Sequence, residues 1–226
     1  METWSYTNEN LEAITQSLNI QPDDKVLAVC SIGAQFLALL EFLKGSGLLV
    51  AVDYNPQQLD LAKTIVDIAV RRDARALARL DICPRNQGYF NRRRLKRIAM
   101  NMPKVRFMQN DLRERLEIKE RFTKVYLSNV LANLNALAEV VEKGSLIYLA
   151  YKNHRGTKIT SKKGIENFIQ YYYGNRFADL ALSDFYAIDV ERTFKAIQLE
   201  SKKPLTEGGF FNPMHVPWCP LIYRRI

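Results

Sequence analysis

The sequence is poor in the residues that build disulfide or zinc frameworks, and it has no long apolar run. Its three cysteines, Cys30, Cys83 and Cys219, are far apart and form no CxxC pair, so neither a disulfide framework nor a structural zinc site is indicated. No uninterrupted apolar stretch reaches the ~18 residues that span a bilayer, and the N-terminus lacks the basic and apolar regions of a signal peptide. We therefore expect a soluble, cytoplasmic protein without a metal.

Positive charge is in excess and is concentrated in one segment. The 226 residues are 47% hydrophobic, enough for one sizeable core, and carry a formal charge of +9. Between Arg71 and Arg106 the basic residues far outnumber Asp73 and Asp81, the acidic residues of that stretch. Charge alone leaves open nucleic acid, a membrane surface or an anionic small molecule as the partner.

Short apolar runs alternate with helical patterns over the first two thirds of the chain. The runs 25–30 and 48–53 predict strands that are buried on both faces, each followed by a helix. Further strands are expected at 104–111, 124–131 and 145–153, with a helix at 131–144. This alternation predicts a parallel sheet with right-handed crossovers.

The chain after residue 153 departs from this alternation. A helical segment at 154–190 precedes two expected strands, 194–202 and 221–226, which a Pro- and Gly-rich loop joins without a helix. A parallel pair needs a long crossover, so one terminal strand must run antiparallel to its neighbour. This element order resembles the class I S-adenosylmethionine-dependent transferases, an α/β fold with a Rossmann-like, seven-stranded, mostly parallel sheet and one antiparallel strand near the C-terminus. The resemblance implies a single donor-binding domain over 1–226, with an N-terminal lid segment at 1–20 and a basic insertion at 71–103.

Candidate ligand-binding residues follow the first two strands. In open parallel sheets, ligands bind at the carboxyl ends of the strands, which places Cys30, Ser31 and Gly33 at the site; an ordinary tight turn would explain the glycine equally well. Asp53 ends the second strand 20 residues after Gly33, the place of a carboxylate that accepts both hydroxyls of a ribose. Asp53 could also cap the next helix, and the neighbouring cofactor-binding candidates are Tyr54 and Asn55.

The later strands supply further candidates. The resemblance implies that Asp111 holds the adenine amino group and that the backbone N–H of Leu112 reaches a ring nitrogen, although Asp111 could simply cap a helix. Asn129, in the apolar run that ends the fourth strand, needs hydrogen-bond partners. The resemblance places it at the edge of the methionine and acceptor pocket.

The first loop departs from the pattern of ordinary methyltransferases of this fold. Where those have an acidic residue and a GxGxG run, this chain has Ala28, Cys30 and Ile32. The segments "PDDKVLAVCSIGA", "LLVAVDYNPQQLDLAK" and "VYLSNVL" resemble the S-adenosylmethionine:diacylglycerol aminocarboxypropyltransferases of betaine-lipid synthesis. The resemblance implies transfer of the 3-amino-3-carboxypropyl group, between molecules or by cyclisation, with methylthioadenosine as the by-product. A small-molecule methyltransferase and a non-catalytic S-adenosylmethionine-binding protein are the alternatives.

No residue stands out as a general base. Tyr6, Asn129 and Tyr151 are the catalytic candidates, because the lid segment and the ends of the fourth and fifth strands would line the acceptor side; His154 is weaker. The basic segment can be a solvated helical insertion, or a lid or membrane-surface patch at 71–106 that collects an anionic or lipid acceptor. Nucleic acid is disfavoured, because "GYFNRRRLKR" comes without a recognisable binding module. The oligomeric state is not predicted.

Overall fold

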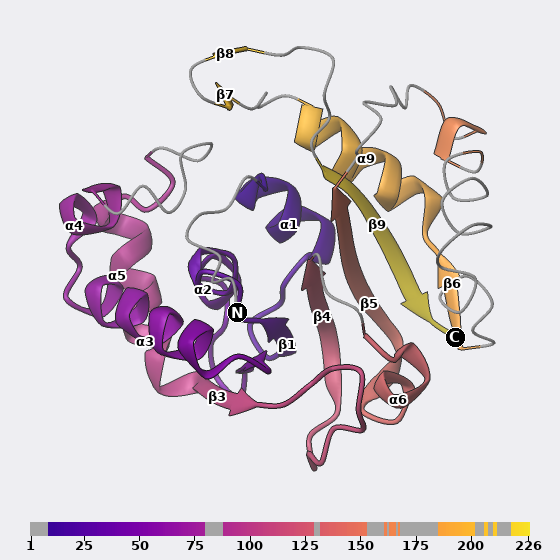
Figure 1. Ribbon diagram of the computed structural model, residues 1–226, viewed down its shortest axis with the longest axis horizontal. Coiled ribbons are helices and arrows are strands. Elements are labelled where there is room, and N and C mark those ends of the chain that lie inside the picture. Colours follow the sequence, from indigo (N-terminus) through magenta and orange to yellow (C-terminus); the bar gives the residue numbers. More distant parts are fainter. Residues whose placement is uncertain are drawn as a thin grey trace.

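A seven-stranded sheet forms the centre of the protein, in the order β3-β2-β1-β4-β5-β9-β6 (Figure 1). The computed structural model describes residues 9–79, 88–128, 132–152, 161, 163–165, 167, 185–201, 206–207, 210–211 and 218–226. The strands of the sheet are β1 (Lys25–Val29), β2 (Leu48–Asp53), β3 (Val105–Gln109), β4 (Phe122–Ser128), β5 (Val141–Lys152), β6 (Tyr186–Ile188) and β9 (Trp218–Arg225). Strands β1 to β5 pair in parallel, and β9 is antiparallel to both β5 and β6. The predicted fold class is therefore confirmed.

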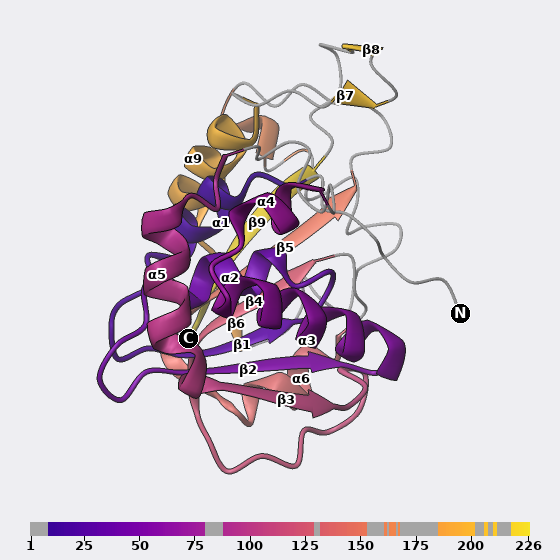
Figure 2. The same ribbon diagram turned by 90° about the vertical axis from the view of Figure 1, so that its left-hand side faces the viewer.

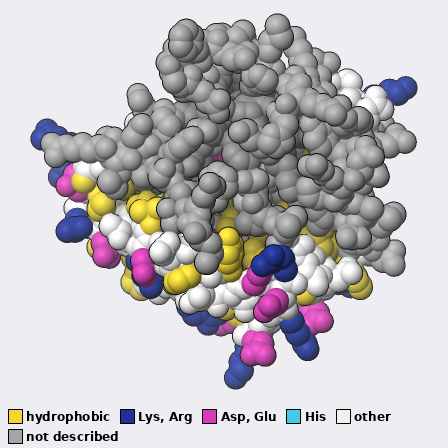
Figure 3. All heavy atoms as spheres, in the orientation of Figure 1, with side chains coloured by type: hydrophobic (Ala, Val, Ile, Leu, Met, Phe, Trp, Pro, Cys, Tyr) yellow, Lys and Arg dark blue, Asp and Glu magenta, His cyan; other side chains and the backbone are white. Residues whose placement is uncertain are grey.

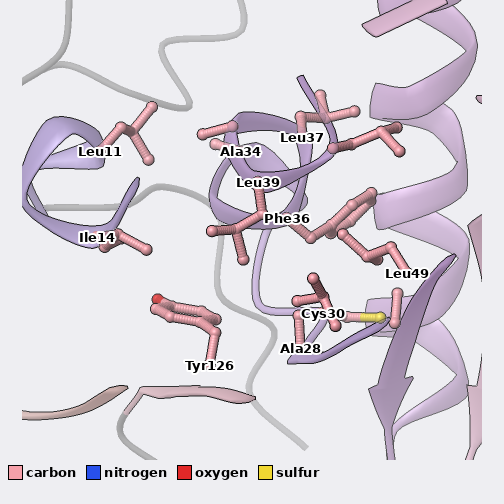
Figure 4. Packing of buried hydrophobic residues seen from close by; sticks show 14 of the residues in the cluster. Leu11, Ile14, Ala28, Cys30, Ala34, Phe36, Leu37, Leu39, Leu49 and Tyr126 are labelled. Carbon is pink, nitrogen blue, oxygen red and sulfur yellow. The ribbon is translucent and has the colours of Figure 1, made fainter. Parts of the chain in front are cut away.

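Helices cover the sheet through two separate hydrophobic clusters. They are α1 (Leu11–Leu18), α2 (Ala34–Leu40), α3 (Pro56–Val70), α4 (Ala74–Arg79), α5 (Arg92–Asn101), α6 (Leu134–Ala138) and α9 (Val190–Ser201). One cluster joins α1, α2, α3 and α5 to Val26 and Ala28 of β1 (Figure 4), and the other joins α6 to Leu27. This division follows from the two-residue period of a strand, which sends successive side chains to opposite faces.

The C-terminal part differs from the sequence expectation. The strand expected at 194–202 is wrong: these residues lie almost wholly within α9, where Thr193, Ala196, Ile197 and Glu200 are buried at helical spacing. The side chain of Asp189 accepts the backbone N–H of Arg192 at 3.0 Å and so begins the helix. The sixth strand of the sheet is β6 instead, and α9 stands between it and β9. A small hairpin of β7 (Thr206–Glu207) and β8 (Phe210–Phe211) precedes β9.

The helix expected at 131–144 is also shorter than predicted. Its described part is α6, and β5 already begins at Val141, which pairs with Phe122 of β4. The apolar residues Val140 and Val141 fit a helix face and a buried strand equally well, so their sequence could not place the boundary.

The carboxyl ends of the parallel strands lie along one edge of the sheet, and helix α5 of the basic insertion lies away from that edge. The side chain of Asn101, which ends α5, donates a hydrogen bond to the carbonyl of Leu40 at the end of α2, at 2.9 Å. The 3-10 helix Met102–Lys104 then leads directly into β3. Figure 2 shows α5 beside the start of β2 and β3, opposite their arrowheads. The helix α5 therefore does not cover the carboxyl ends of the strands.

Candidate functional site

The turn after β1 is held by backbone hydrogen bonds and by α3. The N–H of Cys30 donates to the carbonyl of Val52 at 2.8 Å, and the N–H of Gly33 donates to the carbonyl of Cys30 at 2.9 Å. Ser31 has a φ of 46° and Gly33 a φ of 94°, a region that costs a non-glycine residue about 1–2 kcal/mol. The buried Gln58 side chain donates to the carbonyl of Ser31 and so secures this strained residue.

The apolar residues of this turn point into the protein. Cys30 and Ile32 are fully buried in the cluster formed with α1, α2 and α3, and Figure 4 shows Cys30 among its neighbours. Burial, followed by the charge of Asp53, raises the pKa of the Cys30 thiol far above its ordinary value, so the thiol stays protonated. Ser31 is partly exposed. Among the predicted residues of this loop, Ser31 remains for a ligand, because Gly33 is buried and its N–H and carbonyl are both hydrogen-bonded within the protein.

Asp53 ends β2 as a half-buried carboxylate. Its Oδ1 accepts the backbone N–H of Asn55 at 3.0 Å. Burial raises the pKa of Asp53, and the hydrogen bonds from the backbone of Asn55 and Tyr54 partly oppose this. The helix cap is the role of Asn55, whose buried side chain accepts the N–H of Gln57 at 3.0 Å. Asn55 is thus engaged within the protein, whereas Tyr54 is 54% exposed.

Asp111 follows β3 in an ion pair with Arg113. The Arg113 Nε lies 2.9 Å from both carboxylate oxygens, and the Arg113 backbone N–H donates to Oδ1 at 2.9 Å. These hydrogen bonds lower the pKa of Asp111. The carbonyl of Leu112 accepts the N–H of Asn133 at 2.8 Å, and the Leu112 side chain is buried.

Asn110 is a candidate that the sequence interpretation missed. Its backbone N–H donates to the carbonyl of Asp53 at 3.1 Å, which brings the ends of β2 and β3 together. Its side-chain Oδ1 is buried, and no hydrogen-bond donor among the described residues reaches it. Such an acceptor costs about 1–3 kcal/mol and calls for a partner. The sequence signal for Asn110 is its place beside Asp111 in the "ND" pair that follows β3.

The predicted catalytic residues lie largely outside the described part of the chain. Tyr6, Asn129 and His154 are not among the described residues. Tyr151 belongs to β5, where its backbone pairs with Cys219 of β9, and its side chain is not described. Their assignment stays a prediction.

A buried carboxylate beside the first loop was also missed. Glu9 is 1% exposed, and its Oε2 accepts the hydroxyl of Tyr126 at 2.5 Å and the Nε2 of Gln35 at 3.2 Å. Gln35 Nε2 also donates to the hydroxyl of Ser31 at 3.2 Å. Tyr126 is the register partner of Ala28 in the pairing of β1 with β4. An acidic group therefore lies on the face of the sheet where the first strand carries Ala28.

Part of the basic insertion is neutralised within the protein. The buried Glu41 accepts a hydrogen bond from Arg94 at 2.6 Å and another from Nε of Arg97 at 3.0 Å. Arg94 also stacks over the ring of Tyr89, 4.1 Å from its centroid. The exposed charges of α5 are Arg92, Arg93 and Lys96. In Figure 3, Lys and Arg side chains stand beside Asp and Glu along the described lower edge, so that edge is of mixed charge.

The described residues contain neither a cluster of metal-binding side chains nor a membrane-spanning helix. No group of three or more His, Cys, Asp or Glu side chains in this part of the chain is placed to hold a metal ion. No helix within the described ranges is long and apolar enough to cross a membrane.

Comparison with known proteins identifies the fold. No family model matches the sequence, and no curated protein matches it. The structure is similar to an S-adenosylmethionine-dependent O-methyltransferase from Thermotoga maritima, with a TM-score of 0.55 and 10% identity over 100% of this chain and 68% of the other. The fold is that of the class I methyltransferases.

Two more solved structures share this methyltransferase fold. One is a precorrin-6y C5,15-methyltransferase from Geobacter metallireducens, with a TM-score of 0.51 and 12% identity over 96% of this chain and 87% of the other. The other is coclaurine N-methyltransferase bound to N-methylheliamine and S-adenosylhomocysteine, with a TM-score of 0.51 and 13% identity over 100% of this chain and 77% of the other. At these identities the likeness concerns the fold.

Proposed function

We propose that the protein binds S-adenosylmethionine at the carboxyl ends of β1, β2 and β3 and transfers its methyl group to a small-molecule acceptor. The observation that carries the proposal is the pair formed by Asp53 and Asn110, whose backbones are joined by a 3.1 Å hydrogen bond. One offers a carboxylate at the end of β2, and the other a buried acceptor without a donor among the described residues. Both stand at the edge of the sheet where this class of fold binds nucleotides.

The residues present fit the nucleoside part of the donor. The Asp53 carboxylate suits the two ribose hydroxyls, and the acceptor oxygen of Asn110 suits the adenine amino group, with Asp111 as the alternative. The positive φ of Gly33 turns the backbone at the end of β1, where the sulfur-bearing part would lie.

The donor brings a sulfonium, which is already a good leaving group. The acceptor would form a bond to the methyl carbon while the carbon–sulfur bond breaks, giving S-adenosylhomocysteine and a proton. The protein then has to position the two reactants and exclude water. The turn fixed by Gln58 and the buried residues Cys30 and Ile32 suit this task, because they hold the loop rigid.

Aminocarboxypropyl transfer is the second candidate, and it rests on the departures at Ala28, Cys30 and Ile32. Two observations favour methyl transfer over it. Glu9 places a carboxylate on the face of the sheet that carries Ala28, so the acid missing from β1 is a weaker argument for a rotated methionine arm. The structurally similar enzymes named above are methyltransferases.

The proposal is tested by donor binding and by product identity. We expect calorimetry to detect binding of S-adenosylmethionine and S-adenosylhomocysteine to the full chain. With candidate acceptors, mass spectrometry should then detect S-adenosylhomocysteine and an acceptor heavier by one methyl group. Methylthioadenosine as the enzymatic product would instead establish the second candidate. Absence of donor binding would refute both, and binding without turnover of any acceptor would support a non-catalytic binding protein.

We also propose that the exposed side of α5 favours contact with a membrane surface that carries anionic lipids. Arg92, Arg93 and Lys96 are exposed there, and Met100 is 67% exposed. Co-sedimentation with vesicles containing phosphatidylserine should exceed that with phosphatidylcholine vesicles, and replacing the three basic residues by Ala should abolish the difference. Equal sedimentation with both vesicles would reject this surface.

A further inference from the structure

We infer that Glu9 supplies the negative charge that holds the amino group of the donor's methionine arm, from the segment before α1 instead of from β1. Glu9 is thus a positioning residue for the donor. This inference rests on the proposed function, because it assigns one part of the same site.

The position of Glu9 is the first argument. Ala28 and Tyr126 are register partners on β1 and β4, and both side chains belong to the cluster on the α1 and α2 face of the sheet. In Figure 4 the Tyr126 hydroxyl points toward α1, and it donates to Glu9 Oε2 at 2.5 Å. The strand order of the sheet reverses between β1 and β4, the place where open α/β sheets bind their ligands.

The connection of Glu9 to the first loop is the second argument. The Nε2 of Gln35 donates to Glu9 Oε2 and to the Ser31 hydroxyl, each at 3.2 Å. Ser31 is partly exposed at the turn, while Glu9 is nearly fully buried. Side-chain hydrogen bonds therefore connect Ser31, at the edge of the site, through Gln35 to the carboxylate of Glu9.

The segment that carries Glu9 is firmly anchored. The backbone N–H of Asn10 donates to the buried Glu200 of α9 at 3.0 Å, and the Asn10 side chain donates to the carbonyl of Leu199 at 2.8 Å. Asn10 also caps α1 by accepting the N–H of Glu12 at 3.0 Å. The carboxylate of Glu9 is thus fixed in place before any ligand arrives.

The chemistry of the carboxylate is the third argument. Taking a carboxylate out of water is costly, and its electrostatic reach is long in surroundings of low dielectric. The phenol of Tyr126 and the amide of Gln35 are neutral donors, and both of their hydrogen bonds orient the carboxylate through Oε2. An ammonium group complements such a charge, and the amino group of the methionine arm is the ammonium that the donor brings.

The test compares two ligands that differ in that arm. S-Adenosylhomocysteine carries the amino-acid arm, whereas methylthioadenosine has the same nucleoside without it. We expect Glu9→Gln to weaken S-adenosylhomocysteine binding about 10- to 100-fold in calorimetry, the scale of a charged hydrogen bond, and to change methylthioadenosine binding less than about twofold. Glu12→Gln, which removes the same charge from α1, is the matched control and should leave the ratio of the two dissociation constants unchanged.

Each outcome decides the inference. If the Glu9→Gln protein is partly unfolded, its affinities for both ligands fall by the same factor. The ratio of the two dissociation constants therefore still measures the contribution of the methionine arm. An unchanged ratio would assign Glu9 a purely structural role and overturn the inference. If wild-type protein binds neither ligand, the proposed function itself fails, which is a different result. Selective loss of S-adenosylhomocysteine affinity would support the role of Glu9.

Discussion

The backbone N–H of Asn110 donates a hydrogen bond to the carbonyl oxygen of Asp53 at 3.1 Å. This single contact extends the pairing of β2 with β3 one residue beyond β3, so the two residues that carry the side-chain acceptors are neighbours at the ends of adjacent strands. Adenosine carries its hydroxyls on the ribose and its amino group on the base, so each part can meet one of these acceptors. We therefore expect substitutions of Asp53 and Asn110 to weaken ligand binding more than substitutions elsewhere in the site.

Replacing Asp53 by Asn should separate binding from stability. Burial raises the pKa of Asp53, so the stability that protonation confers is complete below its ordinary pKa and is lost as the pH rises through the raised value. At neutral pH the ionised group thus opposes folding, and Asp53→Asn should melt at the same or a higher temperature than wild type.

The same variant should lose at least about tenfold in S-adenosylhomocysteine affinity, because a charged acceptor is removed from the ribose. Wild-type affinity should also fall as the pH drops through the raised pKa of Asp53. Melting curves and calorimetry on one preparation check both effects. Lower stability with unchanged affinity would mean that Asp53 is a structural residue.

Asn110 and Asp111 are the two candidate hydrogen-bond acceptors for the adenine amino group. Asp111 is already paired with Arg113, whereas the Oδ1 of Asn110 has no donor among the described residues. We therefore expect Asn110→Ala to weaken binding of methylthioadenosine about 5- to 10-fold, the scale of one neutral hydrogen bond. Asp111→Ala should weaken it less. The reverse order in calorimetry would return the adenine contact to Asp111.

Gly33 and Gly144 both have positive φ angles, so Gly144 in β5 can serve as a control for substitution of Gly33 in the first loop. Their φ angles are 94° and 82°, so an Ala at either position should cost about 1–2 kcal/mol in urea unfolding. A Cβ at Gly33 would lie 3.4 Å from Ile65 and Phe36, while nothing lies within 4 Å at Gly144. Only Gly33→Ala should also weaken donor binding, because its strain relaxes at the site. Equal affinities of the two variants would argue against a role for the turn after β1.

Glu41 should matter for stability and not for donor binding. Glu41→Gln replaces the buried charge that Arg94 and Arg97 share, which should cost about 1–3 kcal/mol. Donor affinity should stay within about twofold, since α5 lies away from the carboxyl ends of the strands. Arg93→Ala, an exposed neighbour on α5, is the control and should unfold within about 0.5 kcal/mol of wild type. A large loss of donor affinity in Glu41→Gln would connect the basic insertion to the site.

The parts of the fold that the sequence predicts well are those specified by local pattern. The runs that form β1 and β2 are apolar apart from Lys25 at the start of β1 and Asp53 at the end of β2, and Asn55 and Pro56 mark the start of α3. The sequence of α9 suggests a strand because apolar residues flank a polar one twice in succession, in Phe194-Lys195-Ala196 and in Ile197-Gln198-Leu199. Its helical period becomes clear only when Thr193 and Glu200 are known to be buried.

The candidate site likewise contains residues that the sequence predicts and residues that only the packing reveals. Asp53 could be found because it follows a strand at a known spacing from Gly33. Glu9 could not, since its environment depends on Gln35 and Tyr126, which are 26 and 117 residues away in the sequence. A surface glutamate and a buried one look the same in a sequence, and packing alone distinguishes them.

The burial of Cys30 gives the protein an internal reporter. A protonated, fully buried thiol reacts with alkylating agents only when the turn between β1 and α2 opens. The rate at which peptides containing Cys30 become labelled thus measures the free energy of opening the loop itself. A ligand held by that loop would slow the labelling of Cys30. The cysteine that stands in place of the first loop glycine therefore reports whether the site is occupied, and the measurement needs neither an acceptor nor turnover.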